Sequence, residues 1–270
     1  MRHFIFVLGL LLPGSWTLGA AAHEFWISPE NYQVDPLEAI RADIRVGQNF
    51  EGSRYSFLPK NFERFDIVID GQVIAVEGTL GDRPALNMAV PGEGLAVVVH
   101  ETTDSRLTYS EWVKFTNFVA HKAFPGVLEA HAARGLPETG FVESYRRFAK
   151  SLIAVGNGAG RDKEVGLTTE IVALANPFTD DTSGGLPVKV LYRGAPRADA
   201  QLEVFDKDPT GEVEVTLYRT DDAGQATVPV APGHSYLLDA VVLRDTGNND
   251  PDAGPVWHSL WASLTFHVPE

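Results

Sequence analysis

The sequence predicts a mainly β protein built from two antiparallel β-sandwich domains, with the C-terminal one immunoglobulin-like. Residues 40–46 alternate apolar and charged side chains, the period-two pattern of a half-buried strand. The pair Asp70-Gly71 stands between two apolar runs, which is typical of a tight β-hairpin. After residue 160, about seven short strand-like segments fit the strand count of an immunoglobulin-like sandwich.

A short helical insertion is expected in the N-terminal domain, near residues 108–134. Apolar side chains recur there at spacings of three and four, and Gly135-Leu136-Pro137 follows the run. Pro125 should break or kink this helix. Residues 145–155 follow, and we expect a strand at least in their C-terminal half.

A glycine cluster at residues 156–160 marks the expected domain boundary. The prediction is an N-terminal β-sandwich over residues 23–160 and a C-terminal one over residues 161–270. Each domain is large enough to bury a hydrophobic core of its own.

Charge and composition exclude several functions. The chain has 22 Lys and Arg against 36 Asp and Glu, a formal net charge of -14, so it should repel nucleic acid. It contains no cysteine, which excludes disulfides, thiolate metal sites and cysteine nucleophiles. Metal chemistry would therefore rest on histidine, methionine or carboxylate.

The N-terminus resembles a cleavable signal peptide over residues 1–22. A basic start precedes an apolar run at residues 4–12, and three alanines end at Ala22. We expect export to a bacterial periplasm, and no membrane span in the mature chain. Cleavage after Ala22 would make His23 the first residue.

A mature chain that begins with His23 could chelate a metal ion through its terminal amine and its imidazole. His100 and His258 are the expected further ligands. Glu24 and Glu101 are placed next to two of these histidines, so they could accept hydrogen bonds and orient the imidazoles. His121 and His131 lie in the predicted helix and should be exposed polar residues.

An acidic loop before His258 is a weaker cation candidate. Asp245, Asp250 and Asp252 lie within eight residues of one another, as oxygen ligands for a hard cation would. Their order does not match an EF-hand loop, which favours a solvated turn.

Four segments carry a family resemblance. They are the start at residues 22–27, the middle at 111–115, the stretch 145–156 and the end at 261–266. Together they resemble the exported domain-of-unknown-function family number 4198. The resemblance implies a periplasmic component associated with nickel or cobalt uptake, working beside a membrane metal transporter.

The favoured function is a soluble periplasmic protein that binds Ni²⁺ or Co²⁺ and assists its uptake. No HExxH, GxSxG or P-loop motif is present, so no catalytic residues are assigned and an enzyme is the less favoured class. One alternative is a copper enzyme with a terminal-histidine brace that holds Cu²⁺. Another is a carbohydrate- or protein-binding β-sandwich module that presents Trp26, Trp112, Trp257 and Trp261.

Overall fold

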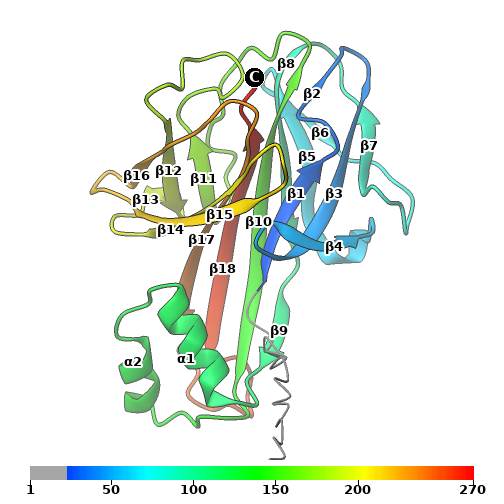
Figure 1. The fold of residues 1–270 in the computed structure, drawn as a ribbon. Helices are drawn as coiled ribbons and strands as arrows, with labels where there is room; N and C mark the ends of the chain where they lie inside the picture. Colours follow the sequence, from blue (N-terminus) through cyan, green and yellow to red (C-terminus); the bar gives the residue numbers. More distant parts are fainter. Residues whose placement is uncertain (1–22) are drawn as a thin grey trace, which may run out of the picture.

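The computed structural model describes residues 23–270. The predicted signal peptide, residues 1–22, lies outside the described residues. Strands dominate the fold and two α-helices lie at one end of it (Figure 1). This confirms the predicted mainly β class with a short helical insertion.

The first sheet belongs to the N-terminal unit. Its strands have the order β1-β3-β4, and β7 also pairs with β3. The bounds are Glu24–Pro29 for β1, Ala39–Gln48 for β3, Glu51–Tyr55 for β4 and Leu86–Ala89 for β7. The predicted alternation is realised in β3, where Ile40, Ala42 and Ile44 face the N-terminal core.

A second, long sheet runs through both halves of the chain. Its order is β15-β14-β17-β18-β10-β8-β5-β6, and the short strands β2 and β9 also pair with β10. The bounds are Gln33–Val34 (β2), Phe62–Ile69 (β5), Gln72–Ala75 (β6), Gly94–Thr102 (β8), Ser105–Thr108 (β9), Val142–Val155 (β10), Gln201–Lys207 (β14), Val213–Arg219 (β15), Ser235–Asp245 (β17) and Trp257–His267 (β18). A single-turn 3-10 helix at Pro59–Asn61 precedes β5. Asp70 and Gly71 form the β5–β6 turn with positive φ angles, as predicted.

The two halves meet where β10 pairs with β18. This pairing is parallel and extends from Glu143 opposite Trp257 to Ser151 opposite Thr265. The predicted antiparallel sandwiches did not include this parallel pairing between the two halves. Parallel pairing needs a long crossover, and the chain between β10 and β18 provides the entire C-terminal unit for it.

A third sheet covers the C-terminal half of the long one. It contains β11 (Thr169–Ala173), β12 (Leu186–Tyr192), β13 (Ala195–Pro196) and β16 (Gln225–Val228). Ile171 and Val190 from this sheet pack with Leu238 and Leu264 from the long sheet. The boundary expected at residue 160 lies in the connection between β10 and β11.

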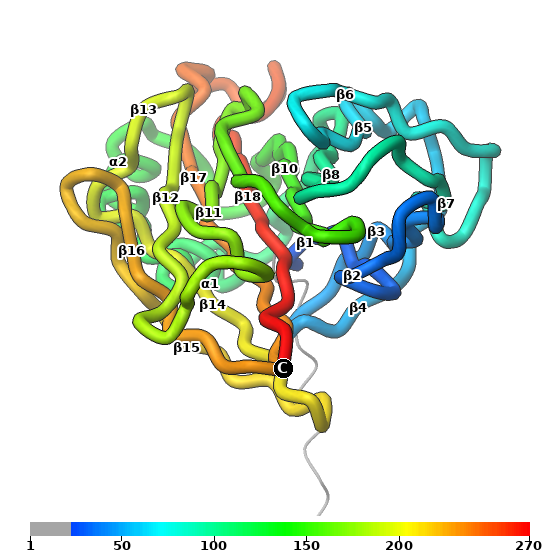
Figure 2. The backbone as a smooth tube through the Cα atoms, turned by 90° about the horizontal axis from the view of Figure 1, so that it is seen from above, coloured from blue at the N-terminus to red at the C-terminus, as the bar shows by residue number. Residues whose placement is uncertain are grey.

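Strands β8 and β10 are buried on both faces, because each face belongs to a different core. Phe148 and Leu152 of β10 join the C-terminal core, whereas Ala149 and Ile153 join the N-terminal core. Seen from above, the strands of the two units lie on either side of β10 and β18 (Figure 2). A strand with both faces covered is apolar almost throughout, so its sequence lacks clear alternation.

The helical insertion forms α1 (Trp112–His121) and α2 (Val127–Ala133). The chain turns between them around Pro125, and Gly126 has φ 76°. The predicted helix with a break at this proline is confirmed. Phe115 and Phe118 pack against Trp257 and Trp261 at the lower ends of the long strands (Figure 1).

Candidate functional site

The N-terminal strand β1 is fixed on the face of the long sheet. The hydroxyl of Ser263 donates to the carbonyl of Phe25 at 2.6 Å, and that of Thr265 donates to the carbonyl of Ile27 at 2.8 Å. Both hydroxyls belong to β18 and are buried. Residue 23 therefore lies directly before an anchored strand.

Side chains of β1 alternate between two environments. Phe25 and Ile27 enter the N-terminal core, whereas Glu24 and Trp26 face the strands of the C-terminal unit. Trp26 fits closely, since a Cβ atom on Gly52 would lie 2.8 Å from its ring. Glu24 is directed into a cluster of buried charges.

This buried charge cluster consists of Glu24, Lys122, Glu203 and Asp239. The Nζ atom of Lys122 lies 2.8 Å from Asp239 Oδ2 and 3.7 Å from Glu24 Oε1, and it also pairs with Glu203. All four residues are at most 5% exposed. The cluster thus places one ammonium group among three carboxylates.

Three parts of the chain build the buried charge cluster. Glu203 of β14 and Asp239 of β17 are direct cross-strand partners, so their side chains share one face of the sheet. Lys122 is the C-cap residue that follows α1, and its ammonium lies 4.9 Å from the centre of the Trp261 ring. The helical insertion and β1 therefore meet over the long sheet.

Burial shifts the pKa values of the cluster. It raises the pKa of Glu24 to about 7, with a further contribution from the charge of Asp239. Burial also raises the pKa of Asp239. Burial alone would lower the pKa of Lys122, but the charges of the three carboxylates raise it instead. Glu24 Oε2 and Asp239 Oδ1 are buried without a hydrogen-bond partner within residues 23–270.

His121 is placed at the exposed edge of this cluster. Its Nε2 lies 2.8 Å from Glu203 Oε1, and its side chain is 62% exposed. The hydrogen bond to Glu203 raises the pKa of His121. For Glu203, burial would raise the pKa, but the bond from His121 and the charge of Lys122 lower it.

The structure places His100 and His258 on opposite faces of the long sheet. His100 is fully buried among Phe25, Phe62 and Phe65, with ring centroids 4.6 to 5.3 Å away. Burial lowers its pKa to about 3, and neither ring nitrogen has a hydrogen-bond partner within residues 23–270. The residues of β18 that flank His258 on its own face belong to the other core.

His258 lies among arginines. Its Nδ1 is 2.9 Å from the guanidinium of Arg244, and its Nε2 is 3.8 Å from Asp104. Burial and the charge of Arg244 lower its pKa. Glu101 binds Arg146 at 2.9 Å, so it lies in this arginine network and not beside His100. The expected convergence of His100 and His258 around one ion is not realised.

The acidic loop is stabilised by its own hydrogen bonds. Asp245 accepts from the backbone of Gly247, and Asp250 accepts from that of Asp252. Arg134 at the end of α2 also binds Asp245 at 3.0 Å. The described part of the chain contains no group of three or more His, Asp or Glu side chains placed to hold a metal ion.

Two expectations about aromatic and histidine side chains are corrected. His131 is buried, and its Nδ1 accepts a hydrogen bond from the indole of Trp257 at 3.0 Å. Trp26, Trp257 and Trp261 are at most 3% exposed, so they form no stacking surface for a sugar. His131, Trp257 and Trp261 contribute to a core where helix and sheet meet, whereas Trp26 packs between strands with Phe205 and Leu237.

Sequence reasoning missed the buried charge cluster. Lys122, Glu203 and Asp239 are far apart in sequence and come together only through the register of β14 and β17 and the docking of α1. One signal was available: Asp239 stands within a strongly apolar strand segment. A carboxylate in such a segment requires a buried partner.

The model of the domain-of-unknown-function family DUF4198 matches residues 20–244. The chain belongs to this family. No curated protein matches the sequence. Among residues 23–270 of this DUF4198 protein, no helix is long and apolar enough to cross a membrane.

Solved structures similar to this DUF4198 protein are distant. The D0-D1 domain of Intimin is 13% identical, with 90% of this chain and 97% of that chain covered and a TM-score of 0.23. A tetra-tandem repeat from the extending region of a large adhesion protein is 10% identical, with coverages of 91% and 49% and a TM-score of 0.21. A Salmonella alpha-2-macroglobulin variant is 13% identical, with coverages of 95% and 16% and a TM-score of 0.23.

Proposed function

We propose that this protein is an exported metal-binding accessory protein whose mature N-terminus captures a late first-row metal ion. The amine and imidazole of His23 are its first two ligands. The observation that carries the proposal is that β1 begins in a fixed position next to a buried cluster with excess negative charge. The metal ion is the cargo, and no catalytic step is assigned.

The first support is the rigid placement of residue 23. Arg147 donates to the carbonyl oxygen of His23 at 3.2 Å, and Glu24 is only 4% exposed. Most chain termini fray unless they are tied down. A terminal chelate on an anchored strand loses little conformational entropy when it binds an ion.

The second support is charge. Three carboxylates of the cluster face one ammonium, and two of their oxygens lack a partner. Buried charges are unfavourable unless they are compensated. A cation bound at residue 23, one residue from Glu24, would offset this excess.

The third support is the set of donors. Lys122 occupies the centre of the carboxylates, so the cluster itself holds an ammonium and not a metal ion. Signal cleavage would add an amine that no side chain supplies. His121 is exposed at the edge of the same cluster and could provide a second imidazole. Nitrogen donors of this kind suit Ni²⁺, Co²⁺ and Cu²⁺.

The family resemblance favours nickel or cobalt among these ions, delivered to a membrane metal transporter from the periplasm. The acidic chain would raise the local concentration of cations near the site. Imidazoles bind metal in their neutral form, so protons compete with the metal ion for the site.

Calorimetric titration of the mature chain, residues 23–270, tests this function. We expect one equivalent of Ni²⁺ or Co²⁺ to bind, and H23A to weaken binding by about 100-fold. H121A should weaken it less, by about tenfold. H258A is the matched control and should leave the affinity unchanged. If H23A binds as tightly as the parent protein, the proposed function is wrong.

A further inference from the structure

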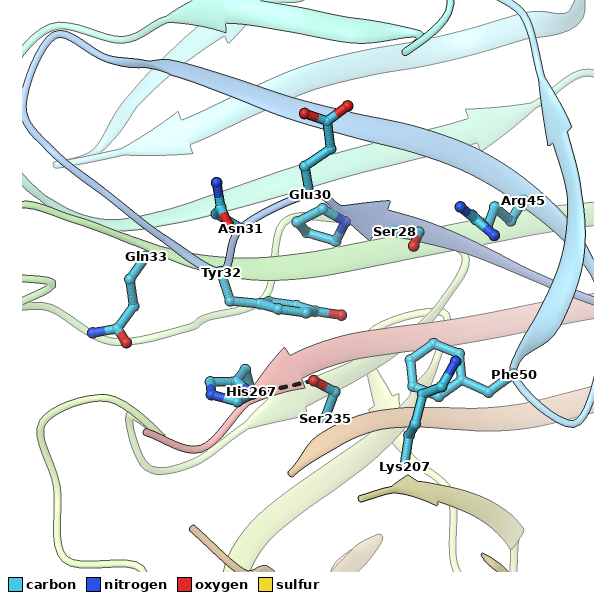
Figure 3. Close-up of a pocket in the computed structure, with 11 residues that line it drawn as sticks. Ser28, Glu30, Asn31, Tyr32, Gln33, Arg45, Phe50, Lys207, Ser235 and His267 are labelled. Carbon is cyan, nitrogen blue, oxygen red and sulfur yellow. Dashed lines mark hydrogen bonds between the residues drawn. The ribbon is translucent and has the colours of Figure 1, made fainter. Parts of the chain in front are cut away.

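A second site lies at the opposite end of β1 from the buried charge cluster. The turn after β1 and the ends of β14, β17 and β18 enclose a cleft of about 550 Å³ (Figure 3). This volume falls in the range of small-molecule sites in proteins. The cleft shares no residue with the proposed metal site.

The floor of the cleft is a row of three polar side chains. Lys207 of β14 is opposite Ser235 of β17, which is opposite His267 of β18. Direct cross-strand partners share a face of the sheet, so all three are presented together. Ser235 Oγ lies 3.1 Å from His267 Nδ1.

The cleft is positively charged although the protein is strongly acidic. Arg45 and Lys207 line it, and no carboxylate within residues 23–270 forms an ion pair with Lys207. Glu30 is the only acidic residue of the lining in the described chain. It points away from the cleft and binds Arg41 at 2.8 Å (Figure 3).

Arg45 also has free hydrogen-bonding capacity. It contacts Asp43 at 3.2 Å through one terminal nitrogen, and Arg54 binds the same carboxylate oxygen at 2.7 Å. Within the described residues, the Nε atom of Arg45 is buried without a partner. An anion in the cleft could accept a hydrogen bond from the Arg45 guanidinium, while Asp43 stays paired with Arg54.

Aromatic rings also line the cleft. The Tyr32 ring stacks on that of His267 with centroids 5.9 Å apart and an angle of 20° between planes. The ammonium of Lys207 lies 5.4 Å from the centre of the Phe50 ring. Figure 3 shows Tyr32 above His267 and Lys207 beside Phe50, with Arg45 at the upper right.

We propose that this cleft binds a small organic polycarboxylate. Arg45 and Lys207 provide two cationic contacts on different walls, which suits a ligand with more than one carboxylate. The cleft is much larger than one inorganic anion, and the neutral donors Asn31, Gln33 and Ser235 can bind hydroxyl or carbonyl groups of a carbon skeleton.

Calorimetry with metal-free mature protein tests the proposal, with succinate, citrate, inorganic phosphate and glucose as probes. We expect saturable binding of citrate or succinate and at least tenfold weaker binding of phosphate and glucose. K207Q and R45Q should each weaken the polycarboxylate by about tenfold or more. K189Q, on β12 of another sheet, is the matched control and should have no effect.

Two results would overturn the proposal. One is the absence of saturable binding of either polycarboxylate up to about 10 mM. The other is unchanged affinity in both K207Q and R45Q while their melting curves match the parent protein. R45Q should fold, because Asp43 retains its pair with Arg54.

Discussion

The guanidinium of Arg147 donates to the carbonyl oxygen of His23 at 3.2 Å. Arg147 is in the middle of β10, directly opposite Trp261 of β18. Its charge also lies over the rings of Phe25 and Tyr145, at 5.6 and 4.8 Å. The first described residue is thus tied to the strand pair that joins both halves of the protein.

Lys122 should be essential for stability, because it compensates three buried carboxylates. We expect K122M to lower the free energy of unfolding by about 3–5 kcal/mol, as when one partner of a buried ion pair is removed. Urea denaturation at pH 7 measures this change.

K114M is the control for Lys122. Lys114 lies on α1, which Lys122 follows, and it pairs with Glu111 near the surface. Loss of this ion pair should lower the free energy of unfolding by no more than about 1 kcal/mol. Adding D239N to K122M should recover part of the stability, since one uncompensated charge is removed. Equal stabilities of K122M and K114M would contradict the role assigned to Lys122.

Glu143 should make the protein less stable as the pH rises. It is 2% exposed, accepts from Tyr109 at 2.7 Å and also bonds Ser259. Burial raises its pKa to about 7. The folded state therefore holds a proton that the unfolded state releases at lower pH. This contribution is complete below about pH 4.5 and is lost as the pH rises through about 7.

E143Q tests this pH dependence. At pH 8 the variant should be more stable than the parent by about 1–3 kcal/mol, with a smaller gain at pH 5. Glu24 titrates in the same window in both proteins, so the difference between them isolates Glu143. E129Q, at an exposed position of α2, should change the stability at neither pH. A stability gain at pH 5 as large as that at pH 8 would contradict the raised pKa of Glu143.

His100 should make the stability of the protein depend on pH in the acid range. Burial lowers its pKa to about 3, so the folded state keeps it neutral while the unfolded state takes up a proton. Its contribution to stability is present above about pH 6.5 and is lost as the pH falls through about 3. H100F should flatten the acid side of the stability curve.

H100F also tests whether His100 is a core residue or a metal ligand. Because three phenylalanine rings surround His100, H100F should leave Ni²⁺ affinity within about twofold of the parent value. Denaturation between pH 4 and 7, together with metal titration, measures both effects. Loss of metal binding in H100F would restore His100 as a ligand.

Local patterns in the sequence predicted local structure well. The alternation at residues 40–46 predicted β3, and the spacing of Phe115 and Val119 predicted α1. The parallel pairing of β10 with β18 could not be predicted, because it joins segments more than 100 residues apart. The apolar run at the C-terminal end of β10 shows no alternation, because that part of the strand is covered on both faces.

The surroundings of individual side chains were harder to predict than the helices and strands. His131 and Trp257 appeared as separate features in the sequence, yet they share a hydrogen bond in one core. His100 and His258 were candidates because of their type, but the alternation of each strand decides the face on which a side chain lies. The buried charge cluster depends on the register of two strands and the position of one helix end, none of which is encoded locally.

The proposed metal site at His23 depends on signal cleavage, which exposes the amine of this residue. The most direct measurement compares Ni²⁺ titrations of two purified forms, one beginning at residue 23 and one that keeps residues 16–22. We predict one tight site in the first form and an affinity about 100-fold lower in the second, because its amine lies seven residues away. Equal affinity in the two forms would contradict the claim.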